Sequence, residues 1–184
     1  MTPKPAGRLS DGWHPVARST DLDRPCPAIL SGQQLVVFRI TGGEVCVLPD
    51  RCLHRGGSLR RGAVVGDAIE CPYHGWRWRG TDGRCVASPG VSTRTTGTLA
   101  AKPAVDRYGL IWTSLGETPA EVPDLPGLGQ GRSYATYEPV DIHCEARPVV
   151  TTTRTDRGRL IQFYSPVRQG VWRVFSVTVT EQVG

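Results

Sequence analysis

Two short cysteine/histidine motifs constrain this chain more than any other part of its sequence. The first is Cys52-Leu53-His54, and the second, sixteen residues further on, is Cys71-Pro72-Tyr73-His74. Glycine follows closely in both places, as Arg55-Gly56-Gly57 and as Gly75. Because the chain between the motifs is long enough for a β-hairpin, each motif can occupy one loop tip, and the two tips can face each other across a small inorganic group.

The residue types predict which group this is. Cysteine supplies a thiolate and histidine a neutral imidazole, and two thiolates on one iron with two imidazoles on the other form the ligand set of a Rieske [2Fe–2S] centre. The alternative is a Cys₂His₂ zinc site. Such zinc sites usually pair cysteine with cysteine and histidine with histidine, whereas each motif here is mixed. The mixed motifs therefore favour one [2Fe–2S] cluster held by Cys52, His54, Cys71 and His74.

Composition narrows the cellular setting. The 184 residues contain no run of about 18 apolar residues, and the N-terminus lacks the apolar segment of a signal peptide. We therefore expect a cytoplasmic protein that does not span a membrane, with its six cysteines as thiols or metal ligands rather than disulfides. The net charge is +5, but the arginines are scattered, so we do not expect nucleic-acid binding.

Short β-branched runs separated by glycine predict an all-β fold. Leu35–Ile40 and Val45–Leu48 flank a Gly-Gly turn, and Asp82-Gly83 predicts a second hairpin. Tyr108–Thr113 is a further expected strand. No window shows sustained helical periodicity. We expect a domain of short antiparallel strands over 1–116, a Pro/Gly-rich connector over 117–133, and a small antiparallel β meander over 134–184, with strands near 137–154, 159–165 and 171–181. So small a meander should pack on the first domain or on a partner.

The first domain resembles a known family. The matching stretches are Gly12–Val16, Asp50–Gly56, Gly62–Asp67, Cys71–Trp76 and Asp106–Trp112, and they resemble the Rieske domain of the Rieske non-haem iron (ring-hydroxylating) oxygenases. The resemblance implies that Cys52 and Cys71 bind one iron and His54 and His74 the other. It also implies that Trp76 shields the cluster and that backbone amides of both loops donate to its sulfurs. The meander resembles, more weakly, a remnant of the family's catalytic-domain sheet.

The subtype follows from two positions. Rieske proteins of respiratory complexes resemble this chain but carry an extra cysteine in each cluster loop, joined as a disulfide, and Gly57 and Tyr73 stand there instead. The missing bridge favours the oxygenase or ferredoxin type. We therefore expect a reduction potential toward the lower end of the Rieske range of roughly −150 to +300 mV.

The sequence supplies too few histidines for the family's second metal. In that family the mononuclear iron is held by two histidines and one carboxylate. Outside the two motifs only His14 and His143 remain in this chain, and the resemblance assigns His14 to the domain framework. We therefore do not expect mononuclear Fe(II) in this chain. An alternative is a non-standard iron site near Asp141, His143 and Glu145, which share one face of an expected strand. The interpretation that we favour for that row is the polar face of a half-buried strand.

These features predict a redox protein. We expect single-electron transfer within an oxygenase system, as an electron-transfer component or as a subunit beside a chain that carries mononuclear iron, rather than a self-sufficient oxygenase. The donor would be a reductase or ferredoxin, and a homo- or hetero-oligomer is a reasonable expectation. Seven arginines against three carboxylates between positions 51 and 84 would steer an acidic partner, unless they are ordinary solvated charges. The alternatives are an atypical oxygenase or cyclase using the Asp141 row, and a redox-sensing or structural subunit. Cys26, Cys46 and Cys85 are expected to be small packed residues.

Overall fold

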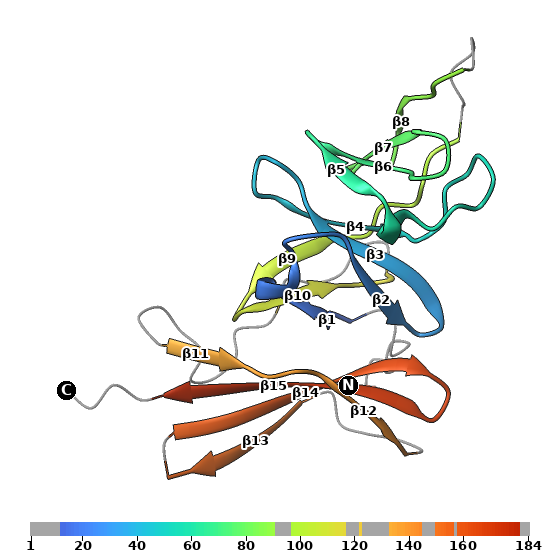
Figure 1. The fold of residues 1–184 in the computed structure, drawn as a ribbon. Coiled ribbons are helices and arrows are strands. Elements are labelled where there is room, and N and C mark those ends of the chain that lie inside the picture. The colour runs from blue at the N-terminus through green and yellow to red at the C-terminus, as the bar shows by residue number, and fades with distance from the viewer. Residues whose placement is uncertain are drawn as a thin grey trace, which may run out of the picture.

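The computed structural model describes residues 12–90, 97–116, 122, 133–144, 150–156 and 158–180. These residues form strands and loops with only two 3₁₀ turns, η2 (Ser19–Asp21) and η3 (Leu59–Arg61), and the all-β expectation is confirmed. No helix in the described part of the chain is long and apolar enough to cross a membrane. Figure 1 shows the strands stacked as small sheets along the length of the molecule.

Three small antiparallel sheets make up the part before residue 117. The sheets have the orders β1-β10-β9, β2-β3-β4 and β5-β6-β7-β8. Their strands are β1 (His14–Arg18), β2 (Cys26–Leu30), β3 (Gln33–Arg39), β4 (Val45–Pro49), β5 (Ala63–Val65), β6 (Ala68–Glu70), β7 (Arg77–Arg79), β8 (Cys85–Ala87), β9 (Ala104–Arg107) and β10 (Leu110–Thr113).

Both predicted hairpins are present. β3 pairs with β4 across the Gly-Gly turn, and β7 pairs with β8 across Asp82-Gly83. The expected strand at Tyr108–Thr113 begins two residues later, at Leu110. Tyr108 has φ 59° and Gly109 has φ 73°, so these two residues form the turn between β9 and β10 rather than extended backbone.

The remaining strands form a separate five-stranded sheet. They are β11 (Ser133–Thr136), β12 (Val140–His143), β13 (Val150–Thr155), β14 (Gly158–Arg168) and β15 (Val171–Thr180). The order is β11-β15-β14-β13, and β12 also pairs with β15. The stretch 137–154, expected to be one strand, is thus divided between β12, which pairs with β15, and β13, which pairs with β14. Most of the connector over 117–133 lies outside the described residues.

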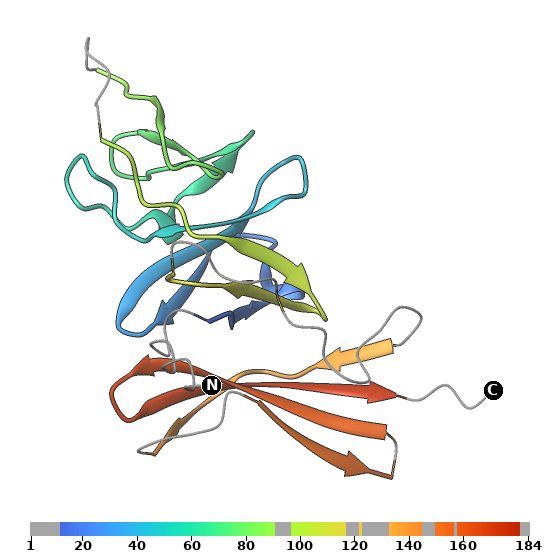
Figure 2. The same cartoon turned by 180° about the vertical axis from the view of Figure 1, so that it is seen from behind.

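This C-terminal sheet packs against the first part through a shared apolar core. Ile161 and Phe163 of β14 and Val177 of β15 are buried together with Leu110 and Trp112 of β10. The Trp112 and Phe163 rings meet edge to face, with centroids 4.9 Å apart. Figure 2 shows the sheet lying against the side of the first part on which β1, β9 and β10 lie. Burial of aromatic rings on both sides makes the two parts one packed unit.

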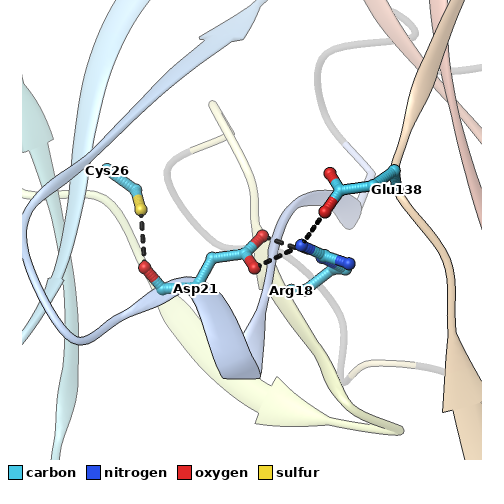
Figure 3. Close-up of polar contacts among 4 residues, drawn as sticks. All are labelled: Arg18, Asp21, Cys26 and Glu138. Carbon is cyan, nitrogen blue, oxygen red and sulfur yellow. Dashed lines mark hydrogen bonds and ion pairs between the residues drawn. The ribbon is translucent and has the colours of Figure 1, made fainter.

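Polar contacts reinforce this packing. The Arg18 guanidinium at the end of β1 pairs with Asp21 at 2.6 Å and also with Glu138, just before β12 (Figure 3). The buried Ser165 hydroxyl donates to the Pro15 carbonyl at 2.6 Å. The contacts of Arg18 with Glu138 and of Ser165 with Pro15 join residues more than a hundred positions apart. Of the two expected outcomes, packing on the first domain or on a partner, the structure shows the first.

None of the six cysteines, all of them among the described residues, forms a disulfide. Cys46 in β4 is buried, and burial raises its thiol pKa to about 12. Cys26 and Cys85 are half-buried, and their thiols donate to the carbonyls of Asp21 and Ala87. Packed or hydrogen-bonded thiols of this kind are poor nucleophiles.

Candidate metal centre

Two loops of the same backbone design carry the cysteine/histidine motifs. In the first, the Cys52 N–H donates to the Gly57 carbonyl at 2.8 Å and the Gly56 N–H returns to the Cys52 carbonyl at 2.8 Å. In the second, the Cys71 N–H donates to Trp76 at 2.8 Å and the Gly75 N–H returns to Cys71 at 3.0 Å.

The fifth residue of each loop is glycine, and its backbone conformation accounts for this. Gly56 and Gly75 have φ of 72° and 69°, a conformation that other residues rarely adopt. The shared signal is therefore Cys-x-x-x-Gly, counted from Cys52 and from Cys71. The sequence contains this shared spacing from cysteine to glycine. It is not apparent when only the spacings from cysteine to histidine are compared, because these differ between the two motifs.

The short strands of the β5–β8 sheet and a buried carboxylate hold these loops. The first loop connects β4 to η3, and the second connects β6 to β7. The Asp50 carboxylate, nearly inaccessible to solvent, accepts hydrogen bonds from the Ser58 hydroxyl and the Arg60 backbone N–H, and pairs with the Arg60 guanidinium at 3.1 Å. Asp50 thereby joins the two ends of the first loop. This role of Asp50 is not predictable from the sequence, because its partners are recognisable only once the loop has closed.

The two histidines lie side by side next to a tryptophan. The His54 and His74 ring centroids are 4.7 Å apart, and the His54 ring stacks on Trp76 at 4.6 Å with an interplanar angle of 6°. His54 Nδ1 is buried and has no hydrogen-bond partner. Burial, together with the positive charges of His74 and Arg55, lowers the pKa of His54. A neutral imidazole with an unpaired inward nitrogen is the form in which histidine binds metal.

The two cysteines are buried and lie close to each other. Burial raises the pKa of the Cys71 thiol and the neighbouring Cys52 raises it further, while backbone N–H groups of Tyr73 and His74 directed at the sulfur lower it. The Trp78 indole N–H lies 3.3 Å from the Cys52 sulfur. A buried sulfur pair with converging N–H donors is suited to thiolates whose negative charge a metal cation offsets.

Gly57 gives the first loop a close approach to the second. A Cβ at this position would lie 3.0 Å from the Cys71 sulfur and 3.4 Å from the Tyr73 Cβ. A side chain there would therefore press on the proposed ligand itself. The short distance to Tyr73 is also close to the Cβ–Cβ separation of about 3.5–4.5 Å found in disulfides.

The double variant Gly57→Cys/Tyr73→Cys is therefore expected to form a disulfide between the two loops, after a small outward shift of the first loop. Mass spectrometry of the denatured, alkylated protein should show two alkyl groups fewer than the number of cysteines predicts. Each single variant serves as a control and should alkylate at every cysteine. Full alkylation of the double variant would show that the loops lie further apart than described.

The arrangement of the four cysteine and histidine side chains bears on the choice between a zinc ion and a [2Fe–2S] cluster. Within the described residues, no three side chains of His, Cys, Asp or Glu are grouped so as to hold one metal ion. A structural zinc ion needs four ligands about 2.0–2.3 Å away. A two-iron cluster needs only two protein ligands at each iron, a thiolate pair on one side and an imidazole pair on the other. The four residues fit the [2Fe–2S] group better than zinc.

At the alternative iron site near Asp141, the described residues form an ion pair instead. The Asp141 carboxylate in β12 accepts two hydrogen bonds from the Arg173 guanidinium, at 2.7 and 2.9 Å, and these hold the pKa of Asp141 below its ordinary value. His143 is exposed, and Glu145 lies outside the described residues. His14 is buried in β1, a strand that precedes both cluster loops in the sequence. The described residues of the Asp141 row match the polar face of a strand.

Fold and site together define a class, an all-β protein with two matched cysteine/histidine loops suited to holding a metal group. The sequence pattern of the Rieske [2Fe–2S] domain family matches residues 12–108, and the chain belongs to this family. It is 34% identical over 147 residues to the oxygenase component of a 3-ketosteroid-9-alpha-monooxygenase from Rhodococcus rhodochrous, covering 75% of this chain and 38% of the relative. It is 40% identical over 119 residues to the alpha subunit of a phenoxybenzoate dioxygenase from Ectopseudomonas oleovorans, covering 62% and 29%.

Structural similarity extends over almost the whole chain. The crystal structure of apo dicamba monooxygenase matches with a TM-score of 0.80 and 18% identity, covering 97% of this chain and 78% of the other. At this identity the match shows the fold alone. The chain spans about a third of the length of the curated relatives that it matches.

Proposed function

We propose that this chain is a cytoplasmic electron-transfer protein of an oxygenase system. It would hold one Rieske [2Fe–2S] cluster on Cys52, His54, Cys71 and His74 and pass single electrons from a reductase or ferredoxin to a chain that carries mononuclear iron. The observation that carries the proposal is the pair of matched loops, which bring two buried thiols and two imidazoles together. The cluster, when bound, would supply the one-electron redox chemistry.

The histidine inventory supports a mononuclear iron held outside these 184 residues. Four histidines are present, and the proposed cluster uses two of them. Of the others, His14 is buried in β1 and His143 is exposed on β12. A mononuclear site of the two-histidine, one-carboxylate type would need both of these together with a free carboxylate. Asp141, the carboxylate beside His143, is instead bound by Arg173.

The surface around the histidines is suited to protein contact. Leu53 and Tyr73, the residues beside His54 and His74, are 49% and 67% exposed. Exposed apolar side chains next to a redox group favour a short-lived protein contact that brings the partner's redox centre close. Figure 1 shows that the β5–β8 sheet, from which the second loop extends, lies at the opposite end of the molecule from the C-terminal sheet.

Charge at this surface favours an acidic partner. Of the seven arginines between positions 51 and 84, four form ion pairs with Asp50, Asp67, Glu70 or Asp82; they are Arg60, Arg77, Arg79 and Arg84. Arg51, Arg55 and Arg61 form no ion pair with the described residues, and all three are exposed. The excess positive charge predicted from the sequence is therefore concentrated on the first loop and η3.

Metal analysis of anaerobically purified protein tests the proposal first. We expect about two irons and two acid-labile sulfides per chain, and a Rieske electron paramagnetic resonance signal that appears on addition of one electron from dithionite. The reduced protein should then pass that electron to ferricytochrome c, a one-electron acceptor. One zinc and no sulfide would refute the cluster, and a third iron without sulfide would refute the division between chains.

Arg55→Glu is expected to slow reduction by an acidic ferredoxin used as the electron donor. The substitution reverses a charge next to His54, and electrostatic steering of this kind changes association rates by about tenfold at low salt. Stopped-flow rates should converge with those of the unmodified protein near 0.5 M NaCl, where screening acts over about 4 Å. The matched control is Arg154→Glu on the exposed face of β13, which should leave the rate unchanged. Equal effects of both substitutions would contradict a docking role for the loop.

A further inference from the structure

Trp78 connects the second loop to a sulfur of the first. It lies in β7, the strand that follows the second loop, and its side chain is fully buried. Its indole Nε1 donates toward the Cys52 sulfur at 3.3 Å, across 26 positions of sequence. This bond joins a side-chain N–H donor to a proposed ligand sulfur.

The acceptor of this hydrogen bond is a cysteine sulfur, and the strength of the bond depends on the charge of that sulfur. A buried indole N–H usually finds a hydrogen-bond partner, and a neutral thiol is a weak acceptor. The same sulfur as a thiolate accepts much more strongly, because hydrogen bonds to charged groups are about twice as strong as those between neutral groups. The contact is therefore best satisfied when Cys52 is a metal-bound thiolate, and it strengthens as negative charge on the sulfur grows.

The neighbouring tryptophan provides a contrast within the same site. Trp76 stacks on His54, and its own indole Nε1 is buried without a hydrogen-bond partner. The two indole rings lie 6.1 Å apart. Both tryptophans thus contact ligands of the first loop, but only Trp78 places a positive dipole at a sulfur.

We propose that Trp78 sets the reduction potential of this protein, a role that rests on the proposed function. One electron from an external reductant adds one negative charge to the site, and no bond is formed or broken. Part of that charge falls on the ligating sulfurs, where the Trp78 N–H stabilises it. Hydrogen bonds to the sulfurs are among the features that set the potentials of iron–sulfur proteins. Trp78 is accordingly a positioning residue that makes the protein easier to reduce.

The test is the midpoint potential of Trp78→Phe, measured by dye-mediated titration with dithionite and followed by visible absorption. Phenylalanine keeps an aromatic ring but lacks the N–H. At a fixed solution potential the reduced-to-oxidised ratio should fall about tenfold, which is 59 mV for a one-electron couple. The matched control is Trp112→Phe, because the Trp112 indole donates to the Arg107 carbonyl outside the cluster loops. This variant should keep the original potential.

A second variant covers the case in which Trp78→Phe fails to retain iron and sulfide. Site-specific replacement of Trp78 by 3-benzothienylalanine, which has the shape of tryptophan with sulfur in place of the N–H, should give the same fall in potential. An unchanged potential in either loaded variant overturns the proposal for Trp78 and leaves the proposed function standing. Absence of a cluster from the unmodified protein overturns both.

Discussion

Cys71→Ala is expected to leave the protein without its cluster, with iron and sulfide falling from about two each per chain to near zero. Cys71 is the buried sulfur toward which backbone N–H groups of Tyr73 and His74 are directed, and it lies close to Cys52. Loss of one thiolate leaves a single protein ligand on one iron, too few to retain the cluster. Iron and sulfide assays, visible absorption and paramagnetic resonance of the reduced sample would each report the loss.

Cys46→Ala is the matched control for this experiment. Cys46 is equally buried but belongs to β4, outside both loops, and its high thiol pKa marks it as a packed thiol. This variant should retain iron, sulfide and the resonance signal in full. A Cys71→Ala protein that also retained them would show that the cluster ligands are assigned wrongly.

Phe163→Ala is expected to lower the free energy of unfolding by about 3–5 kcal/mol, the usual cost of removing a buried phenylalanine ring. Phe163 is almost completely buried, and its ring contacts Trp112 across the junction between the C-terminal sheet and β10. The cavity would open at that junction, so the whole protein should become less stable. Guanidinium unfolding followed by near-ultraviolet circular dichroism measures the change.

Val140→Ala is the control, since Val140 is an exposed residue of β12 in the same sheet. Surface substitutions of this kind usually change stability by less than about 0.5 kcal/mol. If Phe163→Ala instead produced two separate unfolding transitions, with the metal-binding part as stable as before, the two parts would not form one packed unit.

The sequence by itself determined the class of the fold and the four proposed ligands. Turn signals such as Asp82-Gly83 act over a few residues, and the cysteine/histidine motifs are equally local, so both are visible without tertiary structure. The Tyr108-Gly109 turn was missed because tyrosine rarely adopts a positive φ, and its apolar neighbours resemble a strand.

The tertiary structure alone decided which residues surround the ligands and how the C-terminal strands pair. The Trp78 contact with Cys52, the closure of the first loop by Asp50 and the pairing of Arg173 with Asp141 each join residues that are distant in sequence or meet only after a loop closes. The 137–154 stretch divides because β12 and β13 pair with different strands. Such pairings depend on the packing of the whole chain, which no local pattern of residues encodes.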